Sequence, residues 1–253
     1  MSEVSPNTPL SKVRGGRDLS LLLELVRTEG IRRWSDIEEP FIHAVSAFDA
    51  ALVTGKMTTG EYKKKAGAFN DLIIYLLENA TKCELGKTQK RSSVLFDEID
   101  IDICFPAGKG TPPSVGAEVK MLGAPGHKGN KYKPRSARAD LHKRIREVAF
   151  TSIDFKAANS EAREISSFQS WCKETNPKYF AFWAFRVADD ADFTKTRSMT
   201  NGLRHYCNGV GAFFYEQDQQ RKATAYKVRP ASELSLDKAI KQMAQEIVSA
   251  ARK

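Results

Sequence analysis

The sequence predicts an α/β protein in which a mixed β-sheet is flanked by helices and preceded by a helical N-terminal part. Apolar residues repeat at helical spacing in the first third of the chain. Near Arg91 this spacing changes to the strict alternation of β-strands. The order of the expected elements, helices first and then strands mixed with helices, favours a mixed sheet covered by helices.

The helical N-terminal region is expected over residues 17–90, after a disordered segment at residues 1–16. A leucine-rich stretch predicts one helix over 19–27, and a second is expected over 41–53. A third helix follows from the spacing i, i+3, i+4, i+7 of its apolar residues. Those residues are Phe69, Leu72, Ile73, Leu76, Leu77 and Ala80.

Residues 91–253 are expected to hold the sheet and its flanking helices. Alternating apolar residues predict two strands, at 95–105 and 117–122, joined by a loop rich in glycine and proline. The continuous aromatic run at 179–188 is typical of a strand buried on both faces. Two more strands are expected at 209–217 and 222–230, and helices at 136–157, 201–207 and 233–251.

The composition favours a partner that carries negative charge. The 253 residues include 40 Lys and Arg against 31 Asp and Glu, a net charge of +9. Such a surplus favours nucleic acid first and an anionic membrane second. No apolar run approaches the roughly 20 residues of a membrane span, and the N-terminus lacks the apolar core of a signal peptide. Four scattered cysteines without a CxxC pair argue against structural zinc and favour a cytoplasmic protein with free thiols.

Acidic residues gather in the first expected strand of the hairpin. Glu98, Asp100 and Asp102 alternate with isoleucines. Because side chains alternate across a strand, we expect the three carboxylates on one face and the three isoleucines on the other. The isoleucines are Ile99, Ile101 and Ile103.

Glu118 and Lys120 lie two residues apart on the next strand and therefore share a face. If the strands pair, this face lies beside the acidic one. Several neighbouring carboxylates repel one another unless a cation lies among them, and oxygen donors without His or Cys suit Mg²⁺. Such a metal lowers the pKa of bound water and stabilises charge on a phosphate. A nearby lysine orients or deprotonates the attacking water, or neutralises charge on the phosphorane.

These residues resemble a known signature. Asp102 followed by Ile-Cys-Phe, a loop and then Ala-Glu-Val-Lys is similar to the motif of the PD-(D/E)XK nuclease superfamily, most of all to type II restriction endonucleases. Ile101 stands where that motif has its proline. The resemblance implies a restriction-endonuclease-like fold, with Asp102 and Glu118 as Mg²⁺ ligands and Lys120 as the catalytic lysine.

Two ligand assignments remain open at the level of sequence. Asp100 shares the predicted face with Asp102 and is an alternative to it as the main ligand. Glu98 is a candidate ligand for a second metal or a solvated residue at the end of the strand. An alternating acidic strand is also a common exposed face, and Glu-Val-Lys occurs in many solvated strands.

A basic stretch follows Lys120, with nine Lys or Arg between 120 and 146 against the single acid Asp140. A glycine-containing basic loop beside a metal site suits contacts to a phosphate backbone, although a solvated loop is the simpler alternative. Asn130 and Arg135 have the donors to read base edges. The candidate DNA-binding residues are His127, Lys128, Asn130, Lys131, Lys133, Arg135 and Arg138.

We therefore expect a Mg²⁺-dependent endonuclease that hydrolyses phosphodiester bonds in double-stranded DNA. The resemblance implies a type II restriction enzyme that acts as a homodimer on a specific site, and leaves a partner methyltransferase open. A DNA repair or junction-resolving nuclease is the nearest alternative. A DNA-binding module without catalysis and a protein interaction domain are alternatives of other classes.

Overall fold

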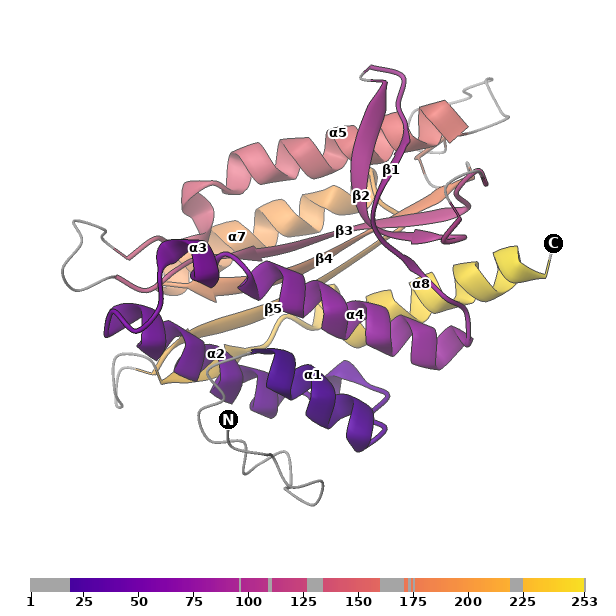
Figure 1. The fold of residues 1–253 in the computed structure, drawn as a ribbon. Helices are drawn as coiled ribbons and strands as arrows, with labels where there is room; N and C mark the ends of the chain where they lie inside the picture. Colours follow the sequence, from indigo (N-terminus) through magenta and orange to yellow (C-terminus); the bar gives the residue numbers. More distant parts are fainter. Residues whose placement is uncertain are drawn as a thin grey trace.

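The computed structural model describes residues 19–95, 97–108, 111–126, 134–159, 171–172, 174, 176–218 and 225–252. The described chain forms a six-stranded sheet in the order β1-β2-β3-β4-β5-β6, with helices on both faces (Figure 1). This confirms the α/β class with a mixed sheet flanked by helices. The expected disorder of residues 1–16 lies outside the described residues.

Three of the strands form the parallel centre of the sheet. Strands β3, β4 and β5 are parallel, while β1, β2 and β6 join by antiparallel pairing. Parallel neighbours need a crossover connection, and helix α5 lies in the one between β3 and β4. The strands are β1 (Gly86–Ser92), β2 (Glu98–Phe105), β3 (Val115–Leu122), β4 (Lys178–Val187), β5 (Gly209–Gln217) and β6 (Tyr226–Arg229).

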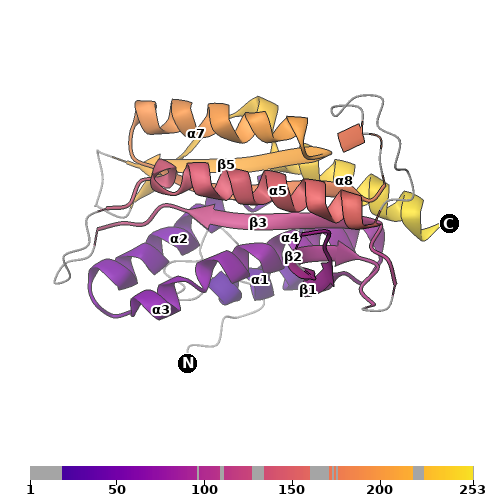
Figure 2. The same cartoon turned by 90° about the horizontal axis from the view of Figure 1, so that it is seen from above.

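Helices form the two outer layers. One layer contains α1, α2, α4 and α8, and the other contains α5 and α7, which run along the sheet in the view from above (Figure 2). The α-helices are α1 (Leu19–Thr28), α2 (Glu38–Val53), α3 (Thr59–Tyr62), α4 (Lys65–Thr81), α5 (Leu141–Asn159), α7 (Asp190–Gly202) and α8 (Leu236–Ala251). Single 3-10 turns are η2 (Trp34–Asp36), η3 (Ala137–Ala139), η4 (Leu203–His205) and η5 (Ser232–Leu234).

Each face of the sheet has its own apolar cluster. Phe69 of α4 and Met243 of α8 pack with Phe180 of β4 on the first face. Phe155 of α5 packs with Trp183 and other residues of β4 on the second. The residues of β4 are buried almost throughout, which confirms that the aromatic run is a core strand. The N-terminal helices share the first cluster, so they belong to the same core as the sheet.

Several expected boundaries differ from the structure, among them the starts of the helices expected from residues 136 and 233, which begin at Leu141 and Leu236 after short 3-10 turns. Strand β1 begins at Gly86, inside the region expected to be helical, because its polar sequence carries no apolar alternation that would reveal a strand. The strand expected from residue 95 begins at Glu98, since the preceding residues turn and Ser93 N donates to Asp97 O. The helix expected over 201–207 is the end of α7 followed by the 3-10 turn η4.

Among the described helices, none has both the length and the apolar character needed to cross a membrane.

A buried polar network fixes the C-terminal end of β3. The carboxylate of Asp49 accepts hydrogen bonds from Tyr62 OH at 2.7 Å and from Tyr226 OH at 2.5 Å. Lys65 Nζ donates to Tyr62 OH and to Gly123 O, the residue that follows β3. Arg186 Nε donates to the other phenol, Tyr226 OH, at 3.0 Å. One fully buried carboxylate thus balances two largely buried cations.

Asp49→Ala is expected to lower the free energy of unfolding by about 3 kcal/mol, because it leaves Lys65 and Arg186 buried without their counter-charge. Urea denaturation measures this value. Asp36→Ala is the matched control, since Asp36 forms an exposed pair with Arg33 and its loss is expected to cost about 0.5 kcal/mol or less. Equal costs for the two variants would contradict the importance of the buried network.

Lys156 on α5 makes the stability depend on pH. Its Nζ donates to Cys172 O and to Tyr206 O, and burial lowers its pKa from 10.5 to about 8. Between these two values the unfolded chain binds more protons than the folded chain, so the free energy of unfolding rises with pH. From pH 7 to pH 9 we expect the wild type to gain about 1 kcal/mol relative to Lys156→Met. Parallel denaturation curves would argue against a buried, readily deprotonated Lys156.

Candidate active site

Strand β2 bends where it leaves β3. It pairs with β1 from Glu98 to Ile101 and again at Ile103 and Cys104, but with β3 only from Ile103 to Phe105. Beyond that point the hairpin of β1 and β2 rises toward α5 (Figure 1). Asp154 on α5 holds the hairpin turn there by accepting from Val94 N at 2.7 Å.

The bend interrupts the alternation of side chains. Ile101 packs in the cluster on the α5 face, whereas Ile103 packs in the cluster on the α4 face. The expectation that Ile99, Ile101 and Ile103 share one face is therefore wrong. The pairing of β1 and β2 skips Asp102 and Thr88, whose φ is 46°, between these positions, and a sequence pattern does not reveal such an interruption.

Asp102 lies at the bend, and its carboxylate replaces a strand partner. Its Oδ2 accepts a hydrogen bond from Val119 N at 2.9 Å, at the point where β2 no longer pairs with β3. Asn70 on α4 donates to Asp102 O at 3.4 Å. The departure of the strand is thus what brings this carboxylate to the backbone of β3.

Glu118 and Lys120 extend from β3 toward the same place. Their neighbours Ala117, Val119 and Met121 pack on the α4 face of the sheet, so these two side chains point to the α5 face. Lys120 Nζ forms an ion pair with Glu118 Oε1 and lies 3.6 Å from Asp102 Oδ2. The side chains of Asp102, Glu118 and Lys120 are 25%, 12% and 23% exposed, so solvent reaches the cluster.

Tyr179, on the neighbouring strand β4, orients Glu118. Its hydroxyl donates to Glu118 Oε2 at 3.1 Å, and the ring is fully buried. Asn208 holds the backbone of Tyr179 from both sides, by accepting from Tyr179 N at 2.9 Å and donating to Tyr179 O at 2.7 Å. The sequence assigns Tyr179 only to the core, because its place beside Glu118 follows from the parallel register of β3 and β4.

Burial and charge act in opposite directions on this cluster. Burial raises the pKa of Glu118, and the nearby Lys120 partly offsets this effect. Burial lowers the pKa of Lys120, but Glu118 and Asp102 outweigh it and the net pKa is raised. Lys120 is therefore an ammonium ion at neutral pH, suited to donating hydrogen bonds and to stabilising negative charge.

Arg144 is a further charged residue that acts on this cluster. It belongs to the basic stretch of residues 120–146, but the sequence gives it no specific role. Its positive charge acts to lower the pKa of Lys120, against the larger effect of Glu118 and Asp102. The guanidinium Nη1 donates to Glu147 Oε2 at 2.6 Å on the same helix, α5.

The other two acidic candidates lie along the hairpin. Glu98 Oε2 accepts from Lys90 Nζ at 3.1 Å, and its side chain is more than half exposed. Asp100 is exposed and lies opposite Lys90 in the register of β1 and β2. The structure therefore brings Asp102, rather than Asp100 or Glu98, to Glu118 and Lys120. In the part of the chain that the structure describes, no three His, Cys, Asp or Glu side chains are grouped to hold a metal ion.

Most of the predicted DNA-binding loop cannot be compared with the structure. His127, Lys128, Asn130, Lys131 and Lys133 lie outside the described residues. Arg135 and Arg138, the two candidates that the structure describes, are exposed, but each pairs with an acidic residue. Arg135 Nη2 lies 2.5 Å from Asp140 Oδ2. Arg138 Nε lies 3.8 Å from Asp192 Oδ1.

No protein-family model, curated protein or solved structure matches this chain. Two carboxylates from different strands, one ammonium group between them and access from solvent are therefore the features from which a function is inferred.

Proposed function

We propose that this chain is a Mg²⁺-dependent endodeoxyribonuclease of the PD-(D/E)XK type, which hydrolyses phosphodiester bonds in DNA. One observation carries the proposal. Lys120 lies against the carboxylates of both Asp102 and Glu118. Asp102 comes from β2 and Glu118 from β3, and the pairing of these two strands ends at this point. The same three residues form the motif that resembles the superfamily.

A restriction-endonuclease-like core is part of this proposal. The mixed sheet with a helical layer on each face is consistent with it. The finer assignment, a type II restriction enzyme that cuts a specific double-stranded site as a homodimer, rests on the resemblance alone.

The donor set fits Mg²⁺. Two carboxylates meet here without His or Cys, and Mg²⁺ usually takes one or two carboxylates together with water and phosphate oxygens. Asp102 and Glu118 would hold the ion. When bound, it would supply positive charge to a phosphate and lower the pKa of a water molecule. In the described structure, the ammonium group of Lys120 lies against both carboxylates and offsets their negative charge.

The protein residues then have distinct roles. Asp102 is fixed by Val119 N, and Glu118 by Tyr179 OH, so neither carboxylate has to be ordered when a substrate arrives. Lys120 donates to the attacking water or to a phosphate oxygen, where its charge stabilises the transition state. The net charge of +9 favours approach of the DNA backbone.

A digest of mixed DNA tests the proposal. Linear duplex, supercoiled plasmid, branched junctions and single strands are incubated with the full chain and Mg²⁺, with EDTA as the negative control. Discrete fragments from duplex DNA favour a restriction enzyme, and cuts confined to branched DNA favour a junction-resolving nuclease. Failure to cut any substrate in the presence of Mg²⁺ would contradict the proposal and favour a binding module.

Tyr179→Phe removes the hydroxyl that orients Glu118 and leaves the ring in place. Groups that orient a metal ligand typically contribute 10- to 100-fold to metal affinity. We therefore expect the Mg²⁺ concentration at half-maximal cleavage to rise by about tenfold, with a smaller change in the maximal rate. A Mg²⁺ titration of the cleavage rate measures both values.

Tyr75→Phe is the matched control, because Tyr75 OH also donates one hydrogen bond, to Val26 O, at a position remote from the site. This variant is expected to keep the Mg²⁺ dependence of the wild type. If both variants shift the titration equally, Tyr179 acts through general stability and does not position Glu118.

A further inference from the structure

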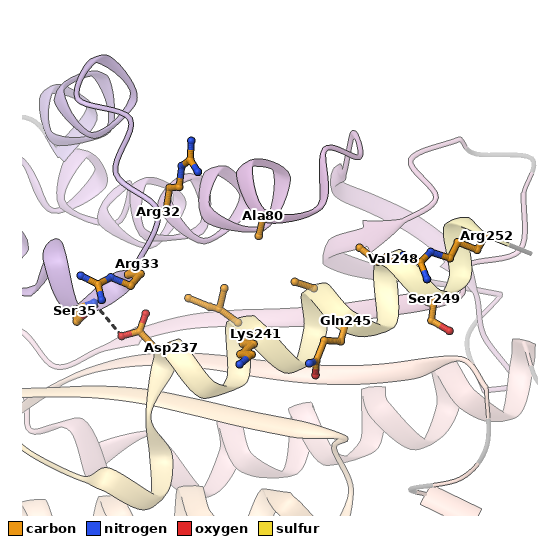
Figure 3. Close-up of a pocket in the computed structure, with 12 residues that line it drawn as sticks. Arg32, Arg33, Ser35, Ala80, Asp237, Lys241, Gln245, Val248, Ser249 and Arg252 are labelled. Atoms are coloured by element: carbon orange, nitrogen blue, oxygen red, sulfur yellow. Dashed lines mark hydrogen bonds between the residues drawn. The ribbon is translucent and has the colours of Figure 1, made fainter.

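A groove runs along α8 on the face of the sheet opposite to Lys120. Its volume is about 840 Å³, and it lies between α8, the C-terminal turn of α4 and the chain around η2. Figure 3 shows Ala80 directed toward α8, Arg32 directed away from it, and Lys241 and Arg252 along the helix. Helices α4 and α8 pack in the apolar cluster on one face, whereas Glu118 and Lys120 point to the other.

The floor of this groove is an apolar stripe. Ile240, Ala244 and Val248 line it at i, i+4 and i+8 along α8, and Ala80 closes it from α4. Val248 is partly exposed, while Ile240 and Ala244 also pack in the core and show only their edges, 6% and 9% exposed. Residues at this spacing lie above one another on a helix. The helix rises about 1.5 Å per residue, so the stretch from Asp237 to Arg252 runs roughly 22 Å. The groove is thus long enough to hold several turns of a second helix.

The rim of the groove carries unbalanced positive charge. Within the described residues, Lys241 and Arg252 make no ion pair, while Arg33 is held by Asp36 at 2.9 Å. The groove's acid, Asp237, is also engaged.

Both oxygens of Asp237 accept backbone hydrogen bonds, from Trp34 N at 2.7 Å and from Ser35 N at 3.1 Å. Its carboxylate therefore ties α8 to η2. Lys241 and Arg252 remain available to a ligand.

We propose that this groove binds an acidic amphipathic helix of a partner protein. Apolar side chains of such a helix would cover Val248 and the exposed edges of Ile240 and Ala244, and its carboxylates would meet Lys241 and Arg252. A nucleic acid strand fits less well. It would offer phosphates to the rim, but among the residues that the structure describes no aromatic side chain lines the groove to stack its bases.

This site is independent of the proposed nuclease activity. It lies on the other face of the sheet and shares no residue with the Asp102, Glu118 and Lys120 cluster. A partner bound here would leave the DNA side open. The groove would therefore recruit or tether the protein without blocking its reaction.

A displayed library of helical peptides about 18 residues long, a length matched to the groove, tests the proposal. Each peptide carries leucines at i, i+4, i+7 and i+11, and Glu, Lys, Gln or Ser in any combination elsewhere. Panning against the full chain is expected to enrich glutamate at the free positions. A selected peptide is then synthesised, and its affinity for each variant is measured by fluorescence anisotropy.

Lys241→Glu is expected to weaken this peptide by about tenfold, while Lys195→Glu, the same change on an exposed position of α7, leaves it within about twofold. The rate of DNA cleavage is expected to stay unchanged in Lys241→Glu. No enrichment of glutamate, or equal binding by both variants, would overturn the proposal. So would displacement of the peptide by duplex DNA, if Lys241→Glu weakened DNA binding by the same factor.

Discussion

Lys120→Ala is expected to lower the rate of Mg²⁺-dependent DNA cleavage by a factor of about 10³, roughly 4 kcal/mol of transition-state stabilisation. The ammonium group lies between Asp102 and Glu118, where a phosphate would have to bind. Its removal deletes a donor and a positive charge at the point where negative charge develops. It does not remove a carboxylate, so Mg²⁺ affinity is expected to stay the same or to rise.

Single-turnover kinetics on a labelled duplex separate these effects. The cleavage rate should fall, while the DNA dissociation constant, measured with Ca²⁺ in place of Mg²⁺, stays within about tenfold of the wild type. Lys90→Ala is the control, since Lys90 is an exposed lysine of the adjacent hairpin whose partner is Glu98. Equal cleavage rates for Lys120→Ala and the wild type would show that Lys120 takes no part in the reaction.

Asp102→Asn and Glu118→Gln are each expected to lower cleavage by about 10³ and to weaken Mg²⁺ binding by at least tenfold. Both changes keep the shape of the side chain and remove its charge. Asp102→Asn can still accept the hydrogen bond from Val119 N through its amide oxygen. The loss is therefore expected to come from the metal and not from unfolding.

Asp100→Asn and Glu98→Gln provide matched controls on the same strand. Both side chains lie along the hairpin near Lys90, and we expect their cleavage rates to remain within about threefold of the wild type. In a calorimetric titration, Asp100→Asn and Glu98→Gln should bind Mg²⁺ as the wild type does, whereas Asp102→Asn and Glu118→Gln should bind it more weakly. If Asp100→Asn loses activity and Asp102→Asn retains it, the assignment of the metal ligand is wrong.

The sequence predicts those parts of the fold whose apolar residues follow a clear helical or strand pattern. The aromatic run of β4 and the helical repeat of α4 show in the order of residues alone. Strand β1 could not be predicted in this way, because its seven residues, Gly-Lys-Thr-Gln-Lys-Arg-Ser, lack apolar alternation. It is held as a strand by its pairing with β2, which is a tertiary effect.

The candidate site divides along the same line. The spacing of Asp102, Glu118 and Lys120 is visible in the sequence, but the choice between Asp100 and Asp102 depends on the bend of β2. Tyr179 could not be found from sequence either, since it lies 61 positions from Glu118 and reaches it through the parallel pairing of β3 and β4. Contacts of this kind depend on strand register, which local periodicity does not contain.

Nicking of supercoiled plasmid DNA by two preparations purified side by side tests the central claim most directly. One preparation is the wild-type chain, and the other combines Asp102→Asn with Glu118→Gln. With Mg²⁺, the wild type is expected to produce nicked and linear DNA in proportion to its concentration, and the double variant is expected to produce none. Equal products from the two preparations, or none from the wild type, would contradict a nuclease site at Asp102, Glu118 and Lys120.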